Sequence, residues 1–244
     1  MDGYGDAHRY FLQHIIAKRI LSASEVKSTY QLCCSKFGVD QDSDLKTFVM
    51  KINHHITPMG LAIKKYSQED FHSSSQCFLL VNTWNTEATR RASSFTQQEF
   101  SFLRKLIDAM VNSGGTINLT EATNLATQAE PKMKLSDGEA FINRLIKNQW
   151  LLQDEDEGNI CLSALSYAEL HTYLEDTYGD MIPKCVLCKL ITFLGYECPS
   201  CEAKVHRMCA EVFWQKVKSP CCPEADCKVT WNHIEINTTK RLRS

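Results

Sequence analysis

Residues 185–227 read CVLCKLITFLGYECPSCEAKVHRMCAEVFWQKVKSPCCPEADC, and this stretch decides the fold of the C-terminal part of the chain. Eight of the twelve cysteines of the 244-residue chain fall within it, together with one histidine. A Cys-x-x-Cys turn places two thiolates on one side of a backbone reversal, where both can reach a tetrahedral Zn²⁺ ion at about 2.3 Å. Seven cysteines and one histidine make eight ligands, enough for two zinc sites with every position filled by protein.

The short spacers between these pairs indicate how the eight ligands divide. Consecutive zinc ribbons would need about 15–20 residues between their Cys pairs, but nine residues separate the first two pairs and four separate the second pair from His206. We therefore expect alternate pairs to share an ion, in the cross-brace arrangement of RING and PHD fingers. The first ion is assigned to Cys185, Cys188, His206 and Cys209. The second ion is assigned to Cys198, Cys201, Cys222 and Cys227.

Two adjacent cysteines, Cys221 and Cys222, compete for the seventh ligand position. The turn formed by Cys222-Pro223 favours Cys222, although the resulting Cys222-x4-Cys227 spacing is longer than usual. Disulfide bonds are the alternative use of these cysteines, and they are disfavoured in a reducing compartment. The chain starts with the polar residues MDGYGDAHR, where a secretory signal peptide would have an apolar run, so we expect an intracellular protein.

The composition limits what the rest of the chain can do. No run approaches the ~18 apolar residues of a membrane span, so we expect no membrane partner. Residues 183–244 carry 10 Lys and Arg against 6 Asp and Glu, which leaves 17 against 23, or a net charge of −6, for residues 1–182. An acidic front portion argues against broad binding of phosphates. We therefore expect direct DNA binding to be weak or absent.

The residues before the zinc stretch show one order of elements twice. In residues 6–92 the apolar spacing predicts three helices, the second capped by Ser22 or Ser24 and the third by Asp42 or Ser43. Two short apolar strands, at 61–63 and 78–81, follow them. Three helices and a β-hairpin make a winged helix.

Residues 93–178 repeat that order. A helix capped by Thr96, a short helix and a helix capped by Ser136 precede strands at 150–152 and 160–162 and a last helix over 163–176. The second hairpin has four consecutive acidic residues at its tip, which a phosphate backbone would repel. We therefore expect these modules to dock proteins rather than read DNA.

The predicted fold class is α+β, with tandem winged-helix domains followed by a C-terminal zinc-binding, cross-brace, RING-like domain. The domains are expected at residues 1–92 (winged helix A), 93–180 (winged helix B) and 181–236 (RING-like zinc domain), with a basic tail at 237–244. Three features favour a RING over a PHD finger: apolar Val186 and Leu187 within the first Cys pair, Trp214 in the expected central helix, and Pro223 after the seventh ligand. A PHD finger has an aromatic residue where this chain has Pro220.

The whole chain resembles the family of the non-SMC element one subunit of the SMC five/six chromosome-maintenance complex. The resemblance is carried by HRYFLQHIIAKRIL at 8–21, by NQWL at 148–151, and by KCVLCKLITFLGYECPSCEAKVHRMCA at 184–210. It covers nearly all of residues 6–236. Two features depart from the family: the final Cys pair is wider than Cys-Pro-x-Cys, and the tail beyond Ile236 is short.

This resemblance implies a function. The winged helices would dock a MAGE-type partner, with a small kleisin subunit and the SMC five/six heterodimer, in DNA repair by homologous recombination, and the protein would be nuclear and chromosome-associated. The RING-like domain would be a ubiquitin-protein ligase without a catalytic residue of its own. It would hold a charged ubiquitin-conjugating enzyme in a reactive orientation. By analogy, the residues that contact that enzyme are Val186, Leu187, Trp214, Pro223 and Lys228. The alternative is a non-catalytic subunit whose zinc domain braces the complex.

Overall fold

The computed structural model describes residues 3–39, 44–83, 95–227 and 229–231. The chain divides into two compact units, one of Met1–Ser67 with Ser75–Ser93 and one of Gln68–Ser74 with Ser94–Ser244. The tip of the first hairpin therefore belongs to the second unit. This unit also contains the second winged helix and the module predicted to bind zinc, whose described residues start at Cys185 and which is called the zinc module below. The expected boundary at 92/93 lies outside the described residues, as does the tail at 237–244, and the four predicted domain ranges stay predictions.

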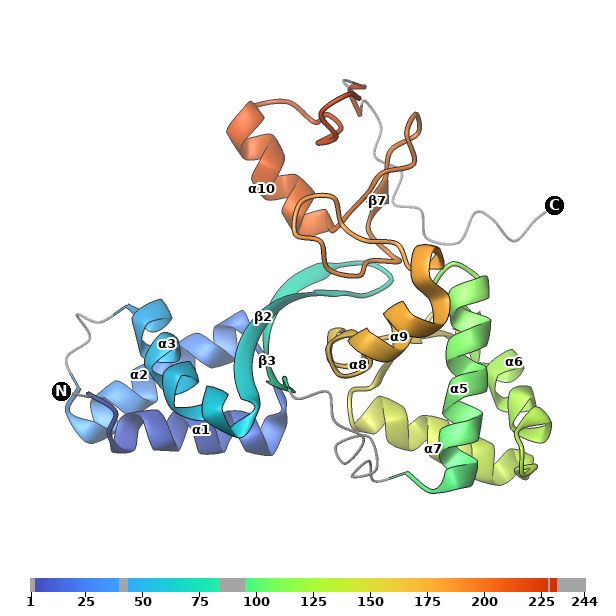
Figure 1. The fold of residues 1–244 in the computed structure, drawn as a ribbon, viewed down its shortest axis with the longest axis horizontal. Coiled ribbons are helices and arrows are strands. Elements are labelled where there is room, and N and C mark those ends of the chain that lie inside the picture. The colour runs from blue at the N-terminus through green and yellow to red at the C-terminus, as the bar shows by residue number, and fades with distance from the viewer. Residues whose placement is uncertain (1–2, 40–43, 84–94, 228, 232–244) are drawn as a thin grey trace. The chain divides into compact units, whose positions relative to one another are not determined.

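The first unit contains three helices and a three-stranded sheet (Figure 1). Its helices are α1 (Asp6–Lys18), α2 (Ala23–Phe37) and α3 (Leu45–Ile56), followed by a 3₁₀ turn at Thr57–Met59. Its strands are β1 (Ile20–Ser22), β2 (Leu61–Glu69) and β3 (Ser74–Asn82), in the sheet order β1-β3-β2. The three helices close over a core in which Phe11, Phe48 and Ile52 are fully buried.

Local side-chain contacts explain where the helices of this unit begin. Ser22 accepts a hydrogen bond from the backbone N–H of Glu25 at 3.2 Å, and the Glu25 carboxylate accepts one from the N–H of Ser22 at 2.9 Å. This reciprocal capping box starts α2 and decides between the two serines that the sequence offered. The third helix starts later than predicted, because Asp44 caps it by accepting from the N–H of Thr47 at 2.7 Å.

The first hairpin is much longer than the sequence indicated. Both β2 and β3 have nine residues, so most of the residues between the two predicted strands, at 61–63 and 78–81, are themselves in strands. The prediction also missed β1, which pairs with β3 through Ile20–Leu79 and Leu21–Phe78. A three-residue strand has too short an alternation of polar and apolar residues to be visible in the sequence.

The second unit contains a second winged helix with the same plan, and the expected fold class is confirmed. Its helices are α5 (Gln97–Asn112), α6 (Leu119–Asn124), α7 (Leu135–Lys147), α8 (Ala164–Glu169) and α9 (His171–Tyr178), with 3₁₀ turns at Leu125–Gln128 and Gly179–Met181. Its strands are β4 (Thr116–Asn118), β5 (Leu151–Gln153) and β6 (Asn159–Leu162), in the order β4-β6-β5.

The helices of the second winged helix agree with the prediction at the start of α5 but not at the start of α7 or in the last helix. Thr96 caps α5 in a second capping box with Glu99, as expected. The start of α7 was predicted wrongly, since this helix begins at Leu135 and lacks a side-chain cap. The single helix expected over 163–176 is instead two helices that meet at Leu170.

The zinc module packs directly on this second winged helix. It contains β7 (Tyr196–Glu197), β8 (Lys204–Val205) and α10 (Arg207–Val217). Ile191 and Phe193, between its first two Cys pairs, are buried in the same hydrophobic core as α5 and α7. Gly115 allows this close approach, because a Cβ at that position would lie 2.3 Å from the Cβ of Phe193. Across the described ranges, no helix combines the length and apolar character needed to cross a membrane.

Candidate metal centre

Four side chains from alternate pairs meet in a first cluster. It consists of Cys185, Cys188, His206 and Cys209, whose ligand atoms all lie within 4.8 Å of one another. The Cys188 Sγ lies 3.2 Å and the Cys209 Sγ 4.0 Å from the Nδ1 of His206. In tetrahedral zinc sites with Zn–S bonds of about 2.3 Å the ligand atoms lie about 3.5–4 Å apart, so the 4.0 Å distance matches and the 3.2 Å distance is slightly short. The spacing of this cluster therefore fits one zinc ion.

The orientation of His206 is set by its second ring nitrogen. Nε2 donates a hydrogen bond to the carbonyl oxygen of Ile191 at 3.1 Å, which leaves Nδ1 facing the sulfur atoms. Metal-bound histidines commonly use such a bond to fix the ring and its tautomer. The backbone N–H of His206 also points at the Cys185 Sγ, at 3.4 Å. One hydrogen bond from its ring and one from its backbone therefore fix the position of His206.

The electrostatics of the cluster suit a cation. Hydrogen bonds from Cys188 and Cys209 hold the pKa of Cys185 far below its usual value. Burial opposes a charge on His206, but its contacts with Cys185 and Cys188 outweigh burial and raise its pKa to about 10. Zinc binds cysteine as the thiolate and histidine as the neutral imidazole, so a bound zinc ion would displace the protons that these side chains carry.

A second cluster forms from the other alternate pairs. It consists of Cys198, Cys201, Cys222 and Cys227. The Sγ atoms of Cys198 and Cys227 are 3.7 Å apart, and those of Cys201 and Cys222 are 3.6 Å apart. Cys198 and Cys201 lie in a turn that follows β7, where the N–H of Cys198 donates to the carbonyl oxygen of Ala203.

The two adjacent cysteines that compete for the seventh ligand position lie in different places in the structure. Cys222 is buried in the second cluster, whereas Cys221 forms a β-bridge with Thr230 outside it. The carbonyl oxygen of Cys221 accepts a hydrogen bond from the indole Nε1 of Trp214 at 2.9 Å. The backbone of Cys221 is therefore occupied by contacts that hold the module together.

The residues expected to contact a conjugating enzyme lie in different environments. Leu187 is 38% exposed between the first two cysteines, and Val186 and Pro223 are half-buried. Trp214 is also half-buried: it stacks on Tyr196 at 5.5 Å between ring centroids and meets Trp231 edge-on at 5.4 Å. Lys228 lies outside the described residues. The predicted enzyme surface is thus clearly accessible at Leu187, while Trp214 also serves the interior of the module.

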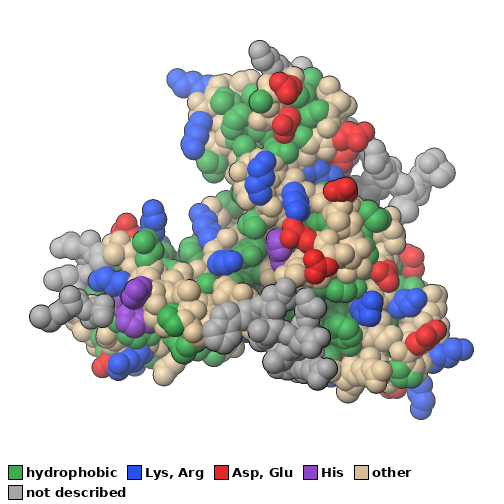
Figure 2. Space-filling model, in the orientation of Figure 1, with side chains coloured by type: hydrophobic (Ala, Val, Ile, Leu, Met, Phe, Trp, Pro, Cys, Tyr) green, Lys and Arg blue, Asp and Glu red, His purple; other side chains and the backbone are tan. Residues whose placement is uncertain are grey.

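An apolar surface on α10 was not part of the prediction. Val212 and Val217 are exposed on this helix, and Figure 2 shows hydrophobic side chains on the visible face of the zinc module. Two buried polar residues next to the first cluster, Thr192 and Arg207, were also not predicted. A buried arginine directly after a ligand histidine leaves no pattern in the sequence, because its partners come from a distant segment.

These features define a class of protein: a RING-like module with two crossed Cys/His clusters, carried by two winged-helix modules. A family model described as a RING-like domain matches residues 185–231, and one described as the Nse1 non-SMC component of the SMC5-6 complex matches residues 8–128. The chain's relationship to the Nse1 family, expected from its motifs, is thereby confirmed.

Individual relatives extend this match over most of the chain. The non-structural maintenance of chromosomes element 1 homologs of Bos taurus and Homo sapiens are 28% and 27% identical over 231 residues, which is 93% of this chain and 85% of each relative. The homolog of Drosophila melanogaster is 26% identical over 177 residues, or 70% of this chain and 73% of the relative. A chain of a solved Nse1-Nse3-Nse4 complex matches with a TM-score of 0.79 and 26% identity, over 96% of this chain and 99% of that one.

Proposed function

We propose that this chain is the RING-type ubiquitin ligase subunit of an SMC5-6 complex, where it docks an Nse3-like, MAGE-type partner and an Nse4-like kleisin. Its similarity to a chain of the Nse1-Nse3-Nse4 complex over 96% of its length supports these partners. The winged helices would provide the docking surfaces. A role in DNA repair by homologous recombination and a nuclear, chromosome-associated location are proposed on the same relationship.

We propose that each Cys/His cluster holds one zinc ion. The donor set supports this assignment, because thiolates with at most one imidazole in tetrahedral spacing are typical of structural zinc. Zinc would hold the module in shape and, since protein fills every ligand position, would not activate water. The side chains of the module itself would therefore perform the function.

The observation that carries the ligase proposal is the exposed apolar side chain of Leu187 within the first Cys pair. Val186 and Pro223, both half-buried, would extend this contact. A RING forms no covalent intermediate with ubiquitin, so the surface would act by binding a charged conjugating enzyme and orienting its thioester. Lys228 is proposed to contribute a cation beside the last ligand.

The second candidate function is a structural brace. It is favoured by Ile191 and Phe193, which build the zinc module into the core of the second winged helix. It is also favoured by Trp214, whose contacts with Tyr196 and Trp231 give the indole an internal role. A brace needs this integration but does not need an exposed Leu187.

One assay separates the two functions. The full chain, loaded with zinc and bound to its Nse3-like and Nse4-like partners, is mixed with a panel of ubiquitin-charged conjugating enzymes, and discharge of the thioester is timed. Leu187→Ala should lose most of the stimulated discharge, while Met181→Ala, which removes another exposed apolar side chain, should not. No stimulation by the wild-type complex would favour the brace, and full activity of Leu187→Ala would refute the proposed surface.

A further inference from the structure

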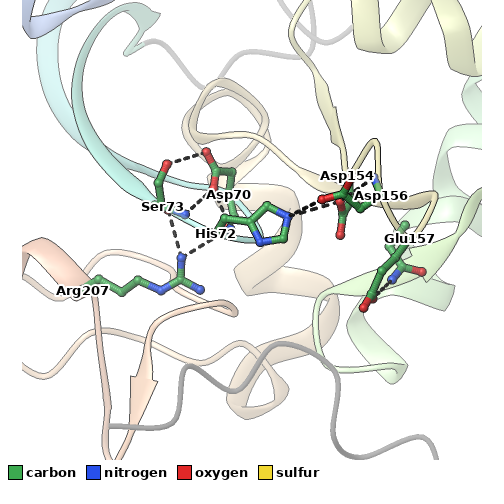
Figure 3. Close-up of polar contacts among 8 residues, drawn as sticks. Asp70, His72, Ser73, Asp154, Asp156, Glu157 and Arg207 are labelled. Carbon is green, nitrogen blue, oxygen red and sulfur yellow. Dashed lines mark hydrogen bonds and ion pairs between the residues drawn. The ribbon is translucent and has the colours of Figure 1, made fainter.

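The tip of the first hairpin, residues 68–74, is partly buried against other parts of its compact unit. Phe71 is 3% exposed and Glu69 is 8% exposed, although Glu69 carries a carboxylate. Gln68 Oε1 accepts a hydrogen bond from the N–H of Ala164, the first residue of α8, at 3.0 Å. His72 Nε2 lies 3.3 Å from Asp154 Oδ1 in the second hairpin (Figure 3). The tip therefore has defined partners.

Glu69 supplies the hydrogen-bond acceptor that the first turn of α10 does not receive from its own N-cap residue. Its Oε1 accepts a hydrogen bond from the backbone N–H of Arg207, the first residue of α10, at 2.7 Å. The residue at the N-cap of α10 is His206, whose side chain faces the first cluster and makes no capping bond. Since the first N–H groups of a helix have no partner within the helix, and a negative charge is favourable there, Glu69 caps α10 from a distant segment.

The second hydrogen bond of Glu69 is with Thr192, next to the residue that orients the His206 ring. Its Oε2 accepts from the hydroxyl of Thr192 at 2.5 Å. Thr192 directly follows Ile191, whose carbonyl oxygen orients the His206 ring. The Glu69 carboxylate thus connects Arg207, which follows His206, with Thr192, which follows Ile191.

Arg207 in turn donates side-chain hydrogen bonds to the hairpin tip. Its Nη1 donates to the carbonyl oxygens of Asp70 and Ser73, each at 3.0 Å (Figure 3). The Asp70 carboxylate holds the same turn by accepting from the N–H and hydroxyl of Ser73 at 2.5 and 2.8 Å. The hairpin tip and the start of α10 are therefore joined in both directions.

We propose that Glu69 is a positioning residue for the first metal cluster, and that zinc binding there and docking of the hairpin tip stabilise each other. This inference rests on the proposed zinc site but is independent of ligase activity. Linkage requires the coupling to be reciprocal. Loss of Glu69 should weaken zinc binding at the first cluster, and loss of zinc should loosen residues 68–74.

The test compares Glu69→Ala, Glu69→Gln and, as a control that removes an exposed glutamate, Glu155→Ala. Zinc release from the full chain to a chromophoric chelator is timed, and hydrogen exchange is followed in peptides covering 68–74, 206–209 and 222–227. Because Glu69→Ala removes two hydrogen bonds to a charged carboxylate beside the first cluster, this variant should release one of its two zinc ions about tenfold faster or more. Exchange should rise at 206–209 but not at 222–227.

Glu69→Gln should fall between wild type and Glu69→Ala, since its amide oxygen still accepts from Arg207, and Glu155→Ala should match wild type. In the reciprocal experiment, chelation of zinc from wild type should speed exchange at 68–74. The inference would be overturned if Glu69→Ala released zinc at the wild-type rate. It would also be overturned if hydrogen exchange at 68–74 were the same with and without zinc. A wild-type protein that binds fewer than two zinc ions would instead refute the proposed zinc module.

Discussion

Replacement of Cys222 by serine should weaken the second metal cluster, while the same change at Cys221 should not. The Sγ of Cys222 lies 3.6 Å from that of Cys201, whereas Cys221 is outside the cluster. Structural zinc contributes roughly 10–16 kcal/mol in finger peptides at pH 7, or about 2.5–4 kcal/mol for each of four ligands if shared equally. Since 1.4 kcal/mol is a factor of ten, Cys222→Ser should weaken one zinc ion by about two to three orders of magnitude.

The measurement is zinc content by native mass spectrometry, combined with competition against chelators of graded affinity. Cys221→Ser should hold two zinc ions, each with the same affinity as in the wild type. Cys222→Ser should hold one ion at wild-type affinity and one far more weakly. If Cys222→Ser keeps both ions at full affinity, or if Cys221→Ser loses one, the assignment of the seventh ligand is wrong.

Three further predictions concern stability and packing. Phe193→Ala should destabilise the second unit by about 3–5 kcal/mol in urea unfolding, because this ring is buried in the core shared with α5; an unchanged midpoint would contradict that docking. Gly195→Ala should reduce bound zinc, since its Cβ would lie 2.3 Å from the carbonyl oxygen of Val205, and a full zinc count would show that β7 and β8 can separate at little cost. Hydrogen bonds from Lys18 and from the N–H of Ser22 lower the pKa of Glu25 to about 2, so its stabilising contribution should be complete above pH 4.5 and lost as the pH falls towards 2. Titration of this carboxyl by NMR checks the value, and Glu25→Gln should remove that part of the pH dependence.

The longer helices of both winged helices could be predicted from the sequence, because helices of 12–16 residues repeat their apolar positions often enough to be recognised. Capping residues were harder to assign. The sequence offered two serines for α2 and the structure uses Ser22, while α3 begins after Asp44 rather than after the two residues expected. Short strands such as β1 and β4 could not be predicted, since their pairing partners are far along the chain.

The spacing of the cysteines was by itself enough to predict that alternate pairs meet, because spacers of four and nine residues leave the backbone few ways to bring four ligands together. The sequence favoured Cys222 over Cys221 only through the following proline. The tertiary structure brings Cys222 and not Cys221 into the second cluster, because the side chains of adjacent residues point in different directions. Only the tertiary structure placed Glu69 against Arg207 and Thr192, residues more than a hundred positions away. Local patterns record which atoms can bind a metal, whereas a buried contact between distant segments exists only after the chain has folded.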